Sequence, residues 1–199
     1  VTTVGARSGI GKSTYGMNVG LNLACGFEYE YGKFNNVDAV PVLYLDTEMG
    51  SDDHKLKNLA NISNVIIDNI ETGQFGLKPE ELARVRDAAS KLKDIPYDVK
   101  SIAGQPFEET LAIMRRWIKQ KVGLDANGKA KDCLIIFDYI KLMDSSGLSS
   151  HLTEFQALGF IMTGLHNFAV KYQIPILCFV QLNRDGIDKE DASATSGSD

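Results

Sequence analysis

The sequence has 199 residues, of which 44% are hydrophobic and 24% are charged, and its formal net charge at pH 7 is −5. This length and balance suit one globular α/β domain with a substantial core. No apolar run approaches the ~20 residues that a membrane-spanning helix requires. The acidic balance argues against a broad, permanently basic surface for nucleic acid.

The first predicted elements are a short strand that includes Val1 and Val4, a glycine-bearing loop, and a helix from Lys12 to Cys25. A strand, such a loop, Lys-Ser and a helix form the context of a Walker A motif. Its glycines let the backbone aim N–H groups at phosphate oxygens, and the start of the helix adds the positive end of its dipole. We therefore expect a nucleotide to bind the loop residues Ala6, Arg7, Ser8, Gly9, Ile10, Gly11, Lys12, Ser13 and Thr14.

Individual side chains of this loop have distinct expected roles. Lys12 would reach the β- and γ-phosphates of ATP, and the Ser13 hydroxyl would bind Mg²⁺. Arg7 would contact phosphate, a neighbouring subunit or a structural salt-bridge partner. Ala6 stands where the usual spacing has a glycine, a small change that still lets the loop close. An ordinary glycine-rich turn is the alternative, but the Gly-Lys-Ser-Thr sequence in a strand-to-helix setting favours the phosphate loop.

After a loop with Gly26 and Gly32, apolar strands alternate with helical segments. The expected strands are residues 40–45, 97–102, 133–137 and 174–180, and the expected helices are residues 52–60, 79–92, 106–122 and 152–172. We expect Ser51 or Asp52 to cap the first of these helices. Apolar strands that alternate with helices predict an α/β fold, a mainly parallel sheet with helices on both faces. Ligands of such sheets bind at the carboxyl ends of the strands.

Glu48 is the candidate general base. We expect its strand to neighbour the phosphate-loop strand, so that the carboxylate orients and deprotonates the attacking water. Asp46 is a rival that lies two residues earlier, farther from the carboxyl tip of the strand. The alternative role for Glu48 is to cap the next helix ahead of Ser51.

Two further strand ends carry candidate residues. The apolar run 134–137 ends in Asp138, a Walker B pattern in which the carboxylate holds Mg²⁺ through water. Gln181 ends the last strand, and its neutral amide would report whether the γ-phosphate is present, or would simply be a solvated strand end. The three cysteines, Cys25, Cys133 and Cys178, lack metal-ligand spacing and are expected to be buried free thiols.

Five motifs in order resemble those of DnaB-type replicative helicases of superfamily 4. The phosphate loop shares that family's alanine in place of the first glycine, and residues 42–49, Val-Leu-Tyr-Leu-Asp-Thr-Glu-Met, resemble its strand ending in Glu-Met. Residues 70–75 look like its short turn between helices, and residues 135–143 look like its Walker B segment. Residues 181–184, Gln-Leu-Asn-Arg, match its third motif, so the resemblance spans nearly the whole chain.

The resemblance implies a RecA-like P-loop ATPase core that hydrolyses ATP with Mg²⁺ in a ring around single-stranded DNA. By position it makes Lys12, Glu48 and Gln181 catalytic, as phosphate ligand, base and γ-phosphate sensor. It assigns the metal to Ser13 and Asp138.

The same resemblance places a DNA-facing loop after Arg184. Thr195, Ser196 and Gly197 resemble the family's Glu-Ser-Gly-Ser segment, and Ala194 stands where that family often has an arginine. For Arg184 a role in binding DNA or a subunit is only slightly favoured over a solvated surface arginine. Main-chain N–H groups of this loop would then bind the DNA backbone.

We expect residues 1–199 to be a RecA-like ATPase core that is cut at both ends and lacks an N-terminal domain and the last strands. Its expected partners are single-stranded DNA, further copies in a hexamer, and a primase or loader, in the cytoplasm of a bacterium or a phage-infected bacterium. One alternative is a RecA-like recombinase ATPase, against which the Asp-Tyr and Gln-Leu-Asn-Arg segments argue. The other is a non-hydrolysing, ATP-gated assembly or loader module, against which the intact Glu48 argues.

Overall fold

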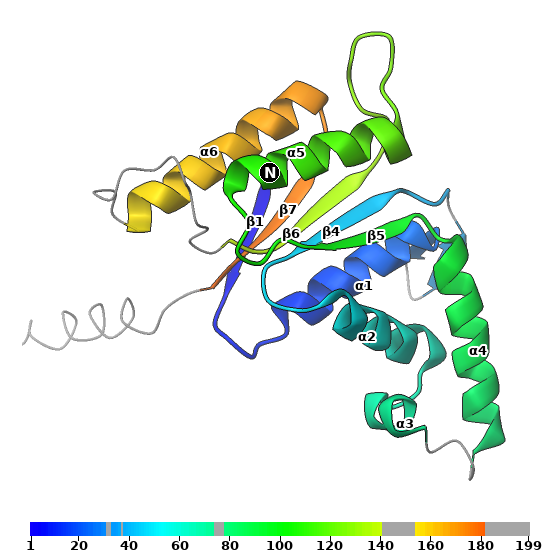
Figure 1. Cartoon of the computed structure of the whole chain (residues 1–199). Helices are drawn as coiled ribbons and strands as arrows, with labels where there is room; N and C mark the ends of the chain where they lie inside the picture. The colour runs from blue at the N-terminus through cyan, green and yellow to red at the C-terminus, as the bar shows by residue number, and fades with distance from the viewer. Residues whose placement is uncertain (31–32, 37, 74–77, 141–153, 182–199) are drawn as a thin grey trace, which may run out of the picture.

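A five-stranded parallel sheet forms the centre of the computed structural model, which describes residues 1–30, 33–36, 38–73, 78–140 and 154–181 (Figure 1). The strand order is β1-β7-β6-β4-β5. These strands are β1 Thr2–Ala6, β4 Val42–Asp46, β5 Tyr97–Ser101, β6 Leu134–Ile140 and β7 Ile176–Gln181. Every neighbouring pair is parallel, which confirms the predicted α/β class.

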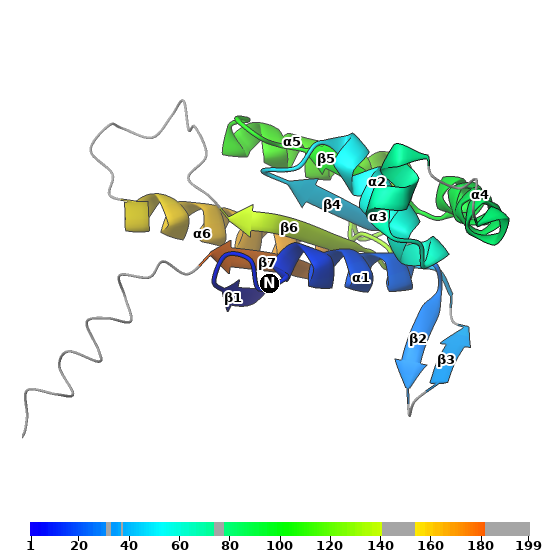
Figure 2. The ribbon, with the colours of Figure 1, turned by 90° about the horizontal axis from the view of Figure 1, so that it is seen from below.

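Helices cover both faces of this sheet (Figures 1 and 2). On one side lie α1 (Lys12–Ala24) and α2 (Ser51–Ser63), with α3 (Ile67–Thr72) and α4 (Pro79–Asp94) beyond α2. On the other side lie α5 (Phe107–Trp117), its π-helical continuation η1 (Ile118–Val122) and α6 (Glu154–Tyr172). Within the described residues, no helix combines the length and the apolar character needed to cross a bilayer.

Two apolar layers hold the helices on the sheet. Leu43 of β4 and Leu165 of α6 belong to the layer under α5 and α6, and both are fully buried. Tyr44 and Phe179 belong to the layer under α1. The first turns of α1 lie very close to the strands, because a Cβ added to Gly16 would stand 2.6 Å from the Phe179 ring. A glycine at position 16 therefore allows α1 to pack directly on the sheet.

Local boundaries differ from the sequence predictions in several places. The predicted loop after α1 contains a hairpin of β2 (Phe27–Glu30) and β3 (Lys33–Asn36), whose alternating Phe-Glu-Tyr-Glu pattern was overlooked beside the glycines (Figure 2). Strand β1 begins at Thr2, and α2 begins at Ser51 after Gly50 without a side-chain cap. The predicted helix 106–122 is α5 followed by η1.

The order of the strands corrects one expectation about the site. Strand β4, which carries the candidate base, does not neighbour β1, because β7 and β6 lie between them. Strand β6 also continues past Asp138 to Ile140, so this carboxylate lies inside the strand and not at its end. Parallel strands are joined by helical crossovers that are free to skip positions in the sheet, so local sequence patterns do not determine the order.

Candidate functional site

The turn between β1 and α1 has the backbone of a phosphate-binding loop. Gly9 has φ +79° and Gly11 has φ +95°, a region that L side chains rarely adopt. A Cβ added at either glycine would meet nothing within 4 Å, so there is space for a larger side chain. The positive φ is therefore the reason that these two positions favour glycine. Helix α1 then begins without a side-chain cap and without an acidic residue in its first turn. Its first N–H groups and its dipole are therefore available to an anion.

Lys12 closes the same loop from within. Its Nζ donates to the carbonyl oxygens of Ala6 at 3.0 Å and of Arg7 at 2.8 Å. Ala6 is the last residue of β1 and Arg7 is the first residue of the turn, so the ammonium group lies inside the predicted phosphate loop. The Arg7 side chain is exposed, and among the described residues it has no ion-pair partner.

Asp138 is 3% exposed, and its two carboxylate oxygens differ in their hydrogen bonds within the described residues. The Tyr44 hydroxyl donates to its Oδ2 at 2.5 Å and lies 3.4 Å from the carbonyl oxygen of Ser13. Its Oδ1 has no hydrogen-bond partner among the described residues. Burial, and then the charge of Asp138, raise the pKa of Tyr44 far above its ordinary value, so this hydroxyl stays a neutral donor. Tyr44 thus holds one oxygen of Asp138 beside the first turn of α1, and it does not occupy Oδ1.

Asp46 lies opposite Asp138 in the sheet, but its oxygens are already occupied. Its Oδ1 accepts the N–H groups of Glu48 and Met49, each at 2.6 Å, and its Oδ2 lies 2.6 Å from His54 Nε2 of α2. Asp46 is 2% exposed. The rival for the role of general base is therefore committed to the turn after β4, and Glu48 is the carboxylate of that turn that faces solvent.

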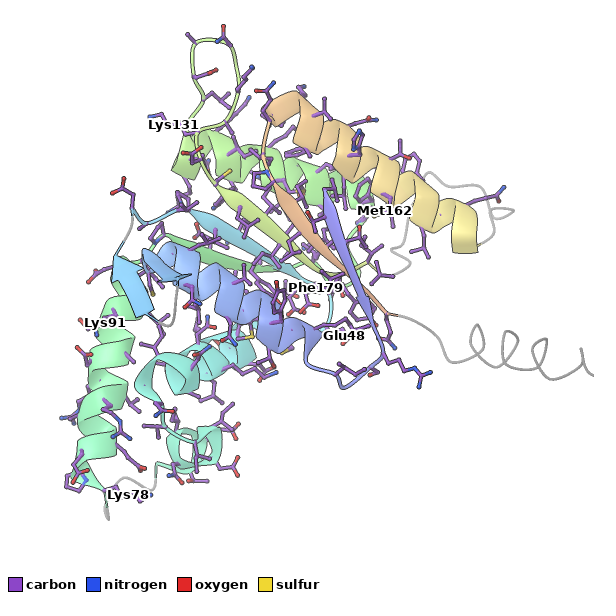
Figure 3. The ribbon with its side chains drawn as sticks, turned by 180° about the vertical axis from the view of Figure 1, so that it is seen from behind. Glu48, Lys78, Lys91, Lys131, Met162 and Phe179 are labelled. Carbon is purple, nitrogen blue, oxygen red and sulfur yellow. The ribbon has the colours of Figure 1, made fainter. Side chains whose placement is uncertain are left out.

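Two hydrogen bonds connect Glu48 and the preceding residue, Thr47, to strand β6. The Tyr139 hydroxyl donates to Glu48 Oε1 at 2.9 Å, and the Thr47 N–H donates to the Asp138 carbonyl oxygen at 2.9 Å. Desolvation, and then the bond to Glu48, raise the pKa of Tyr139 to about 12, so the phenol remains a donor at neutral pH. Figure 3 shows Glu48 at the same edge of the sheet as the turn from β1 to α1.

The structure describes Gln181 but not the predicted DNA-facing residues. Gln181 is the last residue of β7, is half-buried, and lies opposite Ala6 of β1 in register, so it adjoins the root of the phosphate loop. Arg184, Thr195, Ser196 and Gly197 lie outside the described residues.

Three functional candidates were missed by sequence reasoning, namely Tyr44, His54 and Tyr139. Tyr44 sits in an apolar strand and has the pattern of a core residue, and a single histidine in a helix carries no motif. Tyr139 directly follows Asp138, and this adjacency was the one signal that pointed to the site. Within the described ranges, no group of three or more His, Cys, Asp or Glu side chains forms a metal cluster.

The cysteines follow the prediction with one correction. Cys133 and Cys178 are buried free thiols, whereas Cys25 is partly exposed because it lies just past the end of α1. Burial raises the pKa of Cys133 to about 11 and that of Cys178 to about 12.

Comparisons with known proteins find relatives of this chain in sequence and in fold. The replicative DNA helicase DnaC of Bacillus subtilis (strain 168) is 26% identical over 188 residues, which cover 94% of this chain and 36% of that protein. A solved DnaB-like replicative helicase, described with its interactions with primase, superposes with a TM-score of 0.72 at 15% identity, over 92% of this chain and 39% of that one. A solved ATPase domain gives a TM-score of 0.77, also at 15% identity, over 96% of this chain and 60% of that one.

These superpositions show a RecA-like ATPase fold. The model of the family described as "DnaB-like helicase C terminal domain" matches residues 1–197. The chain therefore belongs to the DnaB-like helicase C-terminal domain family.

Proposed function

We propose that this chain is the ATPase motor core of a replicative DNA helicase, which couples ATP hydrolysis to movement along single-stranded DNA. One observation carries the proposal. The Tyr44 hydroxyl lies 3.4 Å from the Ser13 carbonyl oxygen of α1 and donates to Asp138, and the Thr47 N–H and the Tyr139 hydroxyl join the end of β6 to the turn that carries Glu48. A phosphate loop, a buried carboxylate with a free oxygen and an exposed carboxylate thus adjoin one another, as phosphoryl transfer requires.

The residues present fit ATP with Mg²⁺. The buried Asp138 Oδ1 has no partner within the described residues, and the Ser13 hydroxyl lies at the start of α1. Both are the hard oxygen ligands that Mg²⁺ prefers, directly or through water. Held by Asp138 and Ser13, Mg²⁺ would offset negative charge on the phosphate groups during transfer. Tyr44 supports this role because it binds only the other oxygen of Asp138.

The remaining roles follow from the contacts of each side chain. Lys12 would exchange the carbonyl oxygens of Ala6 and Arg7 for phosphate oxygens. The Glu48 carboxylate would take a proton from the attacking water. The Tyr139 hydroxyl would orient this carboxylate by donating to Oε1. Gln181, opposite Ala6, would sense the γ-phosphate.

The chain spans about 36% of the length of the Bacillus subtilis helicase. The assembly, the partners and the cellular location of the whole protein are therefore part of the same proposal. We propose that residues 1–199 are the core of a longer protein that forms a ring of six copies in the cytoplasm of a bacterium or a phage-infected bacterium. Arg184, Thr195, Ser196 and Gly197 would face single-stranded DNA. The solved relative described with primase suggests a primase as a partner, with a loader as the other candidate.

The test is ATP turnover and strand unwinding by the full-length protein, with and without single-stranded DNA. Glu48→Gln keeps the shape of the side chain and removes the proton acceptor, so ATP should still bind while turnover falls at least ~100-fold. Glu108→Gln, an exposed glutamate in the first turn of α5, is the matched control and should change neither quantity. Near-normal turnover in Glu48→Gln would contradict the assignment of the base. ATP binding without DNA-stimulated turnover in the unmodified protein would indicate an assembly module, and strand exchange without unwinding would indicate a recombinase.

A further inference from the structure

His54 is a fully buried histidine that the proposed chemistry leaves without a role. It lies in the first turn of α2 at 0% exposure, and its ring packs against Tyr44 with ring centroids 4.5 Å apart. Its Nε2 lies 2.6 Å from Asp46 Oδ2, whereas its Nδ1 has no hydrogen-bond partner among the described residues. The ring therefore directs its polar contact at Asp46.

We infer that His54 is a positioning residue for ATP hydrolysis, because it locks Asp46 and Asp46 holds the main chain that carries Glu48. The inference rests on the proposed role of Glu48 as general base. Among the described residues, the one side-chain hydrogen-bond partner of His54 is Asp46, and its ring also packs on Tyr44. The hydrogen bond to Asp46 is the contact through which we expect His54 to act.

The turn after β4 shows how this action reaches the base. Asp46 Oδ1 accepts the main-chain N–H of both Glu48 and Met49 at 2.6 Å, so one carboxylate oxygen determines where the backbone of Glu48 lies. The Tyr139 hydroxyl holds the other end of the same side chain at Oε1. Glu48 is thus held at its root by Asp46 and at its tip by Tyr139, although its side chain is exposed to solvent.

The second oxygen of Asp46 explains why a histidine stands in α2. A buried carboxylate oxygen without a donor is costly, so the carboxylate would rotate or admit water to satisfy it. The His54 ring supplies the partner at Oδ2. The main-chain N–H of the same residue donates to the Gly50 carbonyl oxygen at 3.2 Å, a bond that does not depend on the side chain. A leucine would fill similar space and offer no donor. If packing were the sole requirement, the apolar side chain would serve equally well.

The experiment compares three substitutions of His54 in the full-length protein, alone and combined with Glu48→Gln. His54→Leu removes the donor, and His54→Gln places an amide nitrogen near the position of Nε2. His54→Asn is the polar variant whose shorter amide does not reach Asp46, and it replaces His54→Leu if that variant does not fold. Asn58→Leu is the matched control, because Asn58 is 3% exposed one turn later on α2 and makes no bond to Asp46. Circular dichroism, the Kd for ATP and kcat are measured for each.

We expect His54→Leu to bind ATP normally and to lose roughly 10- to 100-fold in kcat, the scale of a misplaced catalytic group. His54→Gln should recover most of that loss, and Asn58→Leu should keep its kcat. In the Glu48→Gln background His54→Leu should add almost nothing, because the group that it positions is gone.

Three results would overturn the inference: an unchanged kcat in His54→Leu, no recovery in His54→Gln, or losses that multiply in the double variant. In each of these cases an inactive Glu48→Gln protein would leave the proposed function standing. Near-normal turnover in Glu48→Gln itself would refute the assignment of Glu48 as the base, and the positioning role of His54 with it.

Discussion

Replacing Tyr44 by phenylalanine removes one oxygen atom from the centre of the candidate site and keeps the aromatic ring. The hydroxyl donates to Asp138 Oδ2 at 2.5 Å, and the two side chains are 0% and 3% exposed. Because the ring remains, no cavity forms and the change in stability comes from the hydroxyl alone. Its removal leaves both oxygens of a buried carboxylate without a protein donor among the described residues.

The size of the effect follows from the kind of bond. A hydrogen bond to a charged group contributes about 1.5–3 kcal/mol to stability, and the contact with the Ser13 carbonyl oxygen at 3.4 Å is too long to add much. For a chain of this length that loss corresponds to a decrease in Tm of roughly 3–12 °C. We therefore expect Tyr44→Phe to lower the free energy of unfolding by about 2 kcal/mol.

Urea denaturation followed by tryptophan fluorescence measures this directly, because Trp117 is the one tryptophan of the sequence and is buried at 6% exposure. Tyr97→Phe is the matched control. The buried Tyr97 hydroxyl makes no hydrogen bond of normal geometry within the described residues, although the neighbouring Asn58 side chain moderates the rise in its pKa. A loss below about 0.5 kcal/mol in Tyr44→Phe, or an equal loss in Tyr97→Phe, would refute the reasoning about a charged, buried bond.

Three further predictions follow from the same structure. Lys12→Ala should abolish hydrolysis and strongly weaken nucleotide binding, since it removes the ammonium group inside the phosphate loop; an unchanged affinity in an ATP titration would contradict this. Gln181→Ala in the full-length protein should leave ATP binding nearly intact and remove the stimulation of turnover by single-stranded DNA, so normal stimulation would rule out the sensor role. Burial raises the pKa of the thiols to about 12 for Cys178 and about 11 for Cys133, so the unfolded chain loses these protons first. The contribution of these thiols to the free energy of unfolding should therefore be fully present below the thiol pKa of the unfolded chain, about 8.5–9. It should decrease as the pH rises toward 11–12, by up to ~1.4 kcal/mol per pH unit for each thiol. Urea denaturation at several pH values measures this decrease.

Much of the site was predictable from local sequence because its chemistry depends on short motifs. The glycines that need positive φ directly precede Lys12, and the apolar run 134–137 directly precedes Asp138, so each motif is complete within a few residues. Backbone preferences and dipoles act over that range, so a strand-loop-helix pattern determines a phosphate loop wherever the fold places it.

The sequence by itself therefore determined the class of fold and the glycine-bearing turn from strand to helix, and it predicted the phosphate loop and the candidate carboxylates. Only the tertiary structure decided that β7 and β6 separate β4 from β1. It also decided that Asp46 is bound by His54, whereas one oxygen of Asp138 has no hydrogen-bond partner among the described residues. The reason is physical. Burial and hydrogen-bond partners come from elements distant in sequence, such as α2 and β6, so the environment of a carboxylate is set only when those elements pack together.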